Sequence, residues 1–182
     1  TEGPYPGIGG GDPDTYLAFC WRFWDLIQKE GHAGVVLPRT AFAASASEDF
    51  RRKLLEEGQF NGITFLVNKQ NWVFPDIHPQ YTITLAAFEK ESPSKNTRLP
   101  LRGPYSNMES FDAGVEREPH YFTVDEAKSW TETATFPLLP ADPASVKAFG
   151  VLSDTPNLDH DDSDEWRVVP ATEVHATSDK KK

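Results

Sequence analysis

The 182-residue sequence contains a single cysteine and no long apolar run. One cysteine excludes a disulfide framework and fits a reducing compartment, so we expect a cytoplasmic protein. No apolar stretch approaches the ~20 residues that a helix needs to cross a bilayer. The first residues show no basic segment followed by an apolar one, so we also expect no signal peptide.

Positive charge is scarce as well. The chain has 18 Lys and Arg against 28 Asp and Glu, which gives a formal net charge of −10. Contact with nucleic-acid phosphates needs clustered Lys and Arg, so this balance argues against DNA binding by this chain alone. The acidic run 159–165 lacks the central glycine and the distal glutamate of a calcium loop, and we interpret it as a solvated loop.

The first half of the chain predicts alternating helices and strands. A helix from residue 12 to about 29 is expected to bury one broad apolar face, formed by Tyr16, Phe19, Cys20, Phe23, Trp24 and Ile27. Cys20 is then a small core residue. A strand at 33–37, a helix at 41–57, and strands at 63–67 and 81–88 follow. This order predicts an α/β fold in which the last two strands pair antiparallel.

Three regions are expected along the chain. Residues 1–11, rich in Gly and Pro, form a flexible N-terminal loop, and residues 12–90 form the α/β unit. Residues 91–182 form an irregular α+β extension. In that extension we expect short strands at Leu99–Tyr105, Tyr121–Val124 and Phe136–Leu139, and a short helix at Pro143–Leu152 with Asp142 as its N-cap.

The loop 71–79, between the last two strands of the unit, is a candidate ligand site. It carries two large aromatic side chains, Trp72 and Phe74, beside Asn, Asp and His. Such a loop at a strand end is a plausible grip for a flat ring, whereas the alternative is that both aromatic residues cap the core. His78 has Pro79 beside it and no nearby Cys or second His, so we expect no metal site.

Three segments together resemble a known family. They are 14–19 (Asp-x-Tyr-x-x-Phe), 31–38, which ends Val-Val-Leu-Pro, and 73–75 (Val-Phe-Pro). In order and spacing they resemble the C-terminal part of the catalytic domain of adenine-specific (N6-adenine) DNA methyltransferases. The match is to the class I, S-adenosylmethionine-dependent kind found in type II and fused restriction–modification enzymes and phage-defence proteins. The resemblance covers about residues 12–90, and residues 169–177 also resemble the entry to a target-recognition region.

The resemblance implies a fold and a site. It implies a partial Rossmann-like methyltransferase sheet of three strands, the last two antiparallel, whose strand at 35–37 has an open edge. Phe74, with Pro75, would stack against an adenine extruded from DNA, and we therefore expect Phe74 to be exposed near the strand ends. Phe19, with Tyr16 nearby, would border S-adenosylmethionine; the alternative for Phe19 is an ordinary core position.

Two motifs of that family do not occur in this sequence: the glycine-rich cofactor loop and the Asn/Asp-Pro-Pro-aromatic motif that holds the amino group. The resemblance therefore implies a fragment that does not methylate DNA by itself. It would need the missing N-terminal half of the domain, would reach DNA through the parent enzyme, and could self-associate through its open sheet edge.

Two other functions stay open. One is a non-catalytic, acidic α/β interaction module that uses the loop at Trp72–Phe74. The other is a hydrolase that uses Asp76, His78 or Asp112, although no nucleophile motif supports it.

Overall fold

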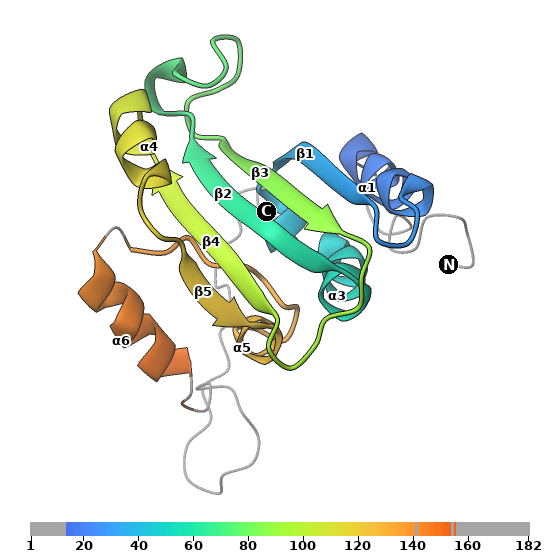
Figure 1. Cartoon of the computed structure of the whole chain (residues 1–182). Coiled ribbons are helices and arrows are strands. Elements are labelled where there is room, and N and C mark those ends of the chain that lie inside the picture. The colour runs from blue at the N-terminus through green and yellow to red at the C-terminus, as the bar shows by residue number, and fades with distance from the viewer. Residues whose placement is uncertain (1–13, 141, 154, 156–182) are drawn as a thin grey trace, which may run out of the picture.

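The computed structural model describes residues 14–140, 142–153 and 155, and these build one mixed sheet with helices (Figure 1). The strand order is β1-β3-β2-β4-β5. The strands are β1 (His32–Pro38), β2 (Gln59–Val67), β3 (Thr82–Glu89), β4 (Arg98–Tyr105) and β5 (His120–Thr123). The helices are α1 (Thr15–Leu26), α2 (Thr40–Ala43), α3 (Glu48–Glu57), α4 (Met108–Val115), α5 (Val124–Ser129) and α6 (Pro143–Ser153), and two 3₁₀ turns are η1 (Ser45–Ser47) and η2 (Lys69–Asn71).

The arrangement of β1, β2 and β3 decides where the carboxyl ends of the strands lie. β3 lies between the other two and is antiparallel to both, which confirms the expected antiparallel pairing of the last two strands. β1 and β2 therefore run parallel to one another, with their carboxyl ends at the same end of the sheet. β1 has one strand neighbour and forms an edge of the sheet, as expected.

The sheet has five strands in the described part of the chain, so the expected three-strand sheet is wrong. β4 pairs parallel to β2, and β5 pairs antiparallel to β4. Leu99 and Leu101 of β4 are buried in the same core as β2 and β3. The expected strand at Leu99–Tyr105 is confirmed as β4. Its position inside the main sheet was not expected, and Pro100 and Pro104 are unusual in an interior strand.

The helix α1 buries a face that overlaps the predicted one: Cys20 and Trp24 are in the core and Tyr16 and Ile27 pack against it, whereas Phe19 does not. Its buried residues are Leu17, Cys20, Trp21 and Trp24. Cys20 is in the core as expected, and burial raises the pKa of its thiol to about 12. Phe19 is 57% exposed and stacks on Phe23 with ring centroids 6.0 Å apart. The apolar residues of α1 surround most of the helix, so spacing alone could not select the buried side.

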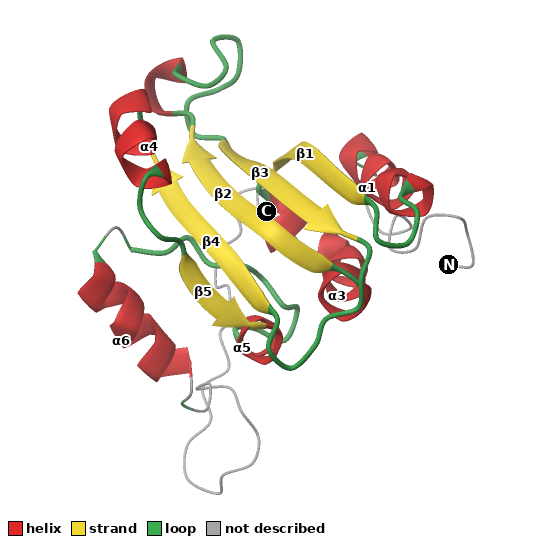
Figure 2. Cartoon of the chain, viewed as in Figure 1, coloured by secondary structure: helices red, strands yellow, loops and turns green. Residues whose placement is uncertain are grey.

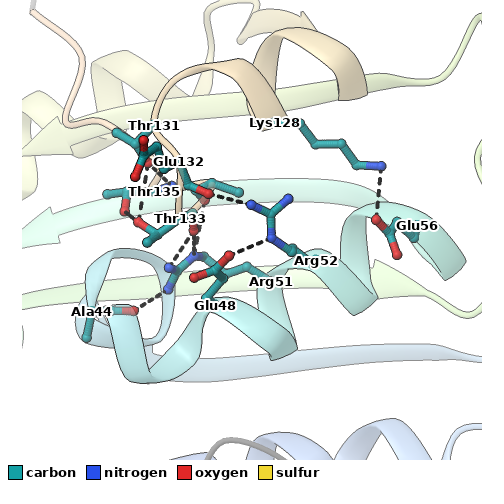
Figure 3. Close-up of polar contacts among 11 residues, drawn as sticks. Ala44, Glu48, Arg51, Arg52, Glu56, Lys128, Thr131, Glu132, Thr133 and Thr135 are labelled. Carbon is teal, nitrogen blue, oxygen red and sulfur yellow. Dashed lines mark hydrogen bonds and ion pairs between the residues drawn. The ribbon is translucent and has the colours of Figure 1, made fainter. Parts of the chain in front are cut away.

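The predicted helix 41–57 is wrong as one continuous helix. α2 ends before Ala44, which has extended backbone angles, and η1 leads into α3. Arg51 of α3 is fully buried and donates to the Ala44 carbonyl at 2.7 Å and to the Thr133 carbonyl at 2.7 Å (Figure 3). The guanidinium therefore supplies donors to the Ala41 and Ala44 carbonyls at the break between α2 and α3.

The predicted strand at Phe136–Leu139 is also wrong. Phe136 is fully buried, and its backbone N–H donates to the Phe42 carbonyl at 2.9 Å, but the segment belongs to no sheet. Its apolar pattern reflects packing against the core, which extended chain outside a sheet can also achieve.

Beyond β4 the sequence specifies helix starts through side-chain caps. α4 and α5 begin with capping boxes, Asn107 with Ser110 and Thr123 with Glu126. The expected helix at Pro143–Leu152 is confirmed as α6, and the Ser145 N–H donates to Asp142 Oδ1 at 2.8 Å.

The described helices leave one face of the sheet uncovered (Figure 2). The core lies on the other face, where α1, α2, α3 and α5 supply buried side chains. No helix among the described residues is long and apolar enough to cross a membrane. The expected loops at 1–11 and 159–165 and the segment 169–177 lie outside the described residues.

Candidate functional site

The loop between β2 and β3 is at the end of the sheet where open α/β folds bind ligands. It begins directly after β2 and projects beyond the carboxyl ends of the strands (Figure 1). β1 ends at this same end, and so does β4, which runs parallel to β2. Three strand ends therefore meet beside the loop.

Phe74 is exposed on this loop, as expected, with 38% of its surface accessible. It lines a hollow of about 360 Å³ together with residues from the end of β1 and the start of β3. The lining is Val36, Leu37, Pro38, Phe74, Ile77, Tyr81, Thr82 and Ile83. No charged side chain is among them. Such a lining suits a flat, apolar face such as that of an aromatic ring.

Tyr81 is a second aromatic residue of the same hollow. It is 60% exposed, and its ring contacts His78 with centroids 6.3 Å apart. Tyr81 and Phe74 both line the hollow, and no ring contact joins them in the described part of the chain. The phenol hydroxyl is one of two polar side-chain groups that the lining offers; Thr82 carries the other.

Asn68 fixes the backbone of the loop. Its side chain is fully buried, although it belongs to a loop residue. Oδ1 accepts from the N–H groups of Val73 and Phe74, each at 3.0 Å. Nδ2 donates to the carbonyls of Phe74 and Ile77, each at 2.9 Å. One amide group thus satisfies four backbone groups of a segment that has no regular secondary structure.

Trp72 lies against the protein rather than toward solvent. Its Nε1–H donates to the Val67 carbonyl at 2.7 Å, and its ring is 6.2 Å from that of Phe111 on α4. The alternative that both aromatic residues cap the core gains no support, because neither belongs to the core cluster or to the residues packed against it. Trp72 joins the loop to α4, whereas Phe74 remains accessible to a ligand.

The two residues expected to border a cofactor do not line the hollow of Phe74. Tyr16 is partly buried against the core, and its hydroxyl lies 3.1 Å from Ser47 Oγ. Phe19 is exposed, so its alternative as an ordinary core residue is wrong. Neither residue lines the hollows described for the loop, for β4 and α4, or for α1 and β1. A role for Tyr16 and Phe19 beside a cofactor stays a prediction.

The hydrolase alternative gains no support from geometry. In the described part of the chain, no hydrogen bond or ion pair joins His78 to Asp76 or Asp112. Instead, His78 Nδ1 accepts from the Gln80 N–H at 3.3 Å. No group of three or more His, Cys, Asp and Glu among the described residues could hold a metal ion.

Asn68 and Tyr81 were missed as site residues by sequence reasoning. Tyr81 was assigned to the strand that follows, where alternation alone suggests half-burial. Asn68 was one of several polar residues after β2. Its position directly behind the last strand residue was the available signal, because Asn side chains often bind nearby backbone groups at such ends.

A second hollow near β4 and α4 differs in chemistry. It has a volume of about 270 Å³, and its lining includes Arg102, Arg117, Glu118 and His120. Arg102 Nη2 donates to the Arg117 carbonyl at 3.1 Å, so this guanidinium already has a protein partner. Mixed charges and an engaged arginine make this a weaker candidate than the hollow at Phe74.

The fold and the site together define an open mixed α/β sheet with an aromatic loop over its strand ends. A chain from a type I restriction–modification system, studied for its complex assembly and conformational transition, has this fold. The likeness has a TM-score of 0.52 at 17% identity and covers 79% of this chain and 37% of that chain.

A second solved structure is a modification subunit assigned to a type I restriction enzyme from Vibrio vulnificus YJ016. It matches with a TM-score of 0.49 at 15% identity, over 71% of this chain and 31% of that chain. This chain therefore spans about a third of the length of both proteins. No protein-family model matches the sequence. No curated protein matches it either.

Proposed function

We propose that this chain is the base-holding part of an adenine-specific DNA methyltransferase of the restriction–modification and phage-defence kind. In this proposal Phe74 is a platform for an adenine swung out of the duplex, and Pro75 shapes the loop beside it. The observation that carries the proposal is the exposed ring of Phe74 over an apolar hollow at the carboxyl ends of the strands. The shared fold with a chain of a type I restriction–modification system supports it.

The physical reason lies in the cost of extruding a base. Unstacking a base from DNA costs a few kcal/mol, which a stack on an aromatic side chain can offset. Such a stack contributes ~1–3 kcal/mol per base. The hollow lacks charged groups, so it holds the face of a ring and gives little hydrogen-bonded discrimination at the ring's edge.

The chemistry of methyl transfer lies outside these residues. S-adenosylmethionine would supply the methyl group in the intact enzyme. This sequence contains neither the glycine-rich cofactor loop nor the Asn/Asp-Pro-Pro-aromatic motif. We therefore propose that it acts with a second segment that carries both motifs, and that the isolated chain is inactive. DNA phosphates are contacted by the parent enzyme, since this chain carries a net charge of −10.

A ring-binding titration tests the platform. The probe is 2-aminopurine riboside, whose fluorescence is quenched when its ring stacks on another ring. Phe74→Leu keeps an apolar side chain but removes the aromatic face. We expect it to weaken binding by roughly 5- to 150-fold, which corresponds to the loss of one aromatic stack. Tyr121→Ala is the matched control, because Tyr121 is an exposed aromatic residue on β5, away from the hollow.

Two outcomes separate the parts of this proposal. Equal binding by the wild-type chain and Phe74→Leu would exclude the platform. A filter assay with labelled S-adenosylmethionine and adenine-containing duplex tests inactivity separately. Turnover by the isolated chain would show that the absent motifs are not needed.

One observation favours a second candidate, a protein-interaction module. Phe19, Leu26 and Val36 are exposed apolar residues of α1 and β1. A hollow of about 630 Å³ lies between this helix and this edge strand. If this surface binds a second copy of the chain, the wild-type protein sediments as a dimer. The Leu26→Glu variant should then have the lower sedimentation coefficient of a monomer. A wild-type chain that is monomeric at every concentration would exclude self-association.

A further inference from the structure

We propose that Asn68 is the positioning residue that fixes Phe74 in a ring-binding orientation before any ligand arrives. This inference rests on the proposed function of Phe74 and deepens it. Asn68 is not itself among the residues that line the hollow. It acts on the hollow through the backbone of the loop.

The hydrogen bonds of Asn68 converge on Phe74. Both backbone polar groups of Phe74 bind the same amide: its N–H donates to Oδ1 at 3.0 Å, and its carbonyl accepts from Nδ2 at 2.9 Å. The same side chain also binds the residues on either side of Phe74: Oδ1 accepts from the Val73 N–H, and Nδ2 donates to the Ile77 carbonyl. The direction in which the Phe74 side chain leaves the backbone is thereby fixed from both sides.

Only a short side chain with both donors and acceptors can make this set of bonds. A carboxylate retains the two acceptors but has no donor for the carbonyls of Phe74 and Ile77. An aliphatic side chain of similar size retains neither. The side chain of Asn68 is also fully buried, so the loop must open before water can replace the missing partners.

Other contacts hold the loop at different places. The Trp72 indole donates to the Val67 carbonyl, before the loop begins. The Asn71 side chain donates to the Pro75 carbonyl. Neither bond reaches the backbone of Phe74. Asn68 is therefore the side chain whose loss frees Phe74 itself.

A pre-fixed platform has a functional consequence. Ring binding costs less conformational entropy when the loop that carries Phe74 is already ordered before the ligand binds. Loss of the Asn68 bonds should therefore weaken ring binding even though no contact to the ring is removed. This effect distinguishes positioning from direct contact.

The test uses Asn68→Asp and a pH profile between pH 5 and 8. Burial and the two facing carbonyl oxygens favour the neutral form of the new carboxyl group, whereas the N–H groups of Val73 and Phe74 favour the carboxylate, and the profile measures where the group titrates. At low pH the neutral carboxyl donates to one carbonyl and restores part of the set. At high pH the carboxylate repels both carbonyls, so Phe74 keeps the bond of its N–H to residue 68 but loses that of its carbonyl. Ring affinity of this variant should therefore fall as pH rises.

The wild-type chain is the reference for every other titrating group. Charged or titratable side chains of the loop, the β1 end and α4 are Lys69, Asp76, His78, Tyr81, Arg39, Glu109 and Asp112. All are present in both proteins, so their titration cancels in the ratio of the two affinities. Asn107→Asp makes the same chemical change at the N-cap of α4, where a carboxylate is tolerated, and serves as the matched control.

Two readouts are measured on the full chain, after circular dichroism shows that each variant is folded. The first is 2-aminopurine riboside affinity. We expect Asn68→Asp to bind roughly tenfold or more weakly than wild type at pH 8, as the loss of buried hydrogen bonds implies, and to recover at pH 5. The second is amide exchange of Val73 and Phe74, which should be slow in wild type and faster in Asn68→Asp at pH 8.

The outcomes separate this inference from the proposed function. If the wild-type chain binds the ring and Asn68→Asp binds it with the same affinity at pH 8, the positioning role is overturned. So does unchanged protection of the Phe74 amide in the variant. If wild type binds no ring while the variant loses protection, the proposed function fails and the fixing of the loop by Asn68 stands.

Discussion

Two irregular segments of this molecule each have a backbone bound by a buried polar side chain, but one exposes its phenylalanine and the other buries it. One is the loop between β2 and β3, and the other is the segment 131–139 after α5. Each has its backbone bound by one fully buried polar side chain, Asn68 in the first and Arg51 in the second. Arg51 donates to carbonyls of Thr133 and Ala134 from below the segment (Figure 3).

The aromatic residues of the two segments have different surroundings. Phe136 is fully buried, with its ring within 6 Å of those of Phe42, Phe60 and Trp130. Phe74 makes no ring contact among the described residues and is 38% exposed. Weak anchoring does not explain this exposure, because Asn68 makes four hydrogen bonds to the loop. A fixed backbone that presents an exposed ring is the expected design of a binding surface.

The largest expected effect contrasts the two phenylalanines directly. Phe136→Ala removes a ring from a packed core and should cost ~3–5 kcal/mol of unfolding free energy. Phe74→Ala should change it by less than about 0.5 kcal/mol, as for surface positions in general. Urea unfolding followed by circular dichroism measures both. A large loss of stability in Phe74→Ala would show that this ring is part of the core and would break the comparison.

A second contrast tests the buried cation. Burial lowers the pKa of the Arg51 guanidinium to about 10, which still leaves it protonated at pH 7. Arg51→Met leaves several buried carbonyls without donors and should cost about 3 kcal/mol, since each such group costs ~1–3 kcal/mol.

Arg52 is the matched control for Arg51. It lies next in the sequence and pairs with Glu48 at 2.7 Å on the exposed side of α3. Arg52→Met should cost less than about 1 kcal/mol, because exposed ion pairs contribute little. Equal costs for the two variants in urea unfolding would show that the buried hydrogen bonds of Arg51 contribute nothing specific.

Among the three buried groups compared, Phe136, Arg51 and Asn68, the smallest loss of stability is expected at Asn68. Asn68→Ala removes four hydrogen bonds, but the loop lies at the rim of the sheet, where water can enter after the change. We expect a loss of about 1–2 kcal/mol in unfolding free energy, below that of Arg51→Met. Amide exchange should report where the loss occurs: faster at Val73 and Phe74, and unchanged in β2. Equal acceleration throughout β2 would mean that Asn68 supports the whole sheet.

Sequence patterns predicted the parts whose side chains alternate or recur regularly. The strands at 33–37, 63–67 and 81–88 and the helix α6 were found because their apolar spacing matches one type of element. The break at Ala44 was missed because the residues around it favour helix locally, and the buried Arg51 that explains it depends on Thr133, distant in sequence. Tertiary contacts of that kind leave no local pattern.

The site was predicted in part for the same reason. Phe74 was selected from its loop and its neighbours; its exposure is confirmed, and its role as a base platform stays a prediction. Asn68 could not be recognised, because its role comes from four backbone groups that meet it only after the loop has folded. Tyr81 lines the hollow because the loop turns back at His78, whose carbonyl accepts the Tyr81 N–H at 3.0 Å. Spacing gives no sign of such a turn.

The most direct test of the central claim is a nuclear Overhauser measurement between adenosine and a chain with labelled phenylalanine rings. Phe74 and Phe19 are both exposed, so the two rings have comparable access to the nucleoside. The account predicts contacts from the base protons of adenosine to the ring of Phe74, together with their loss in Asn68→Asp at pH 8. Bound adenosine that contacts other rings and leaves Phe74 untouched would contradict it.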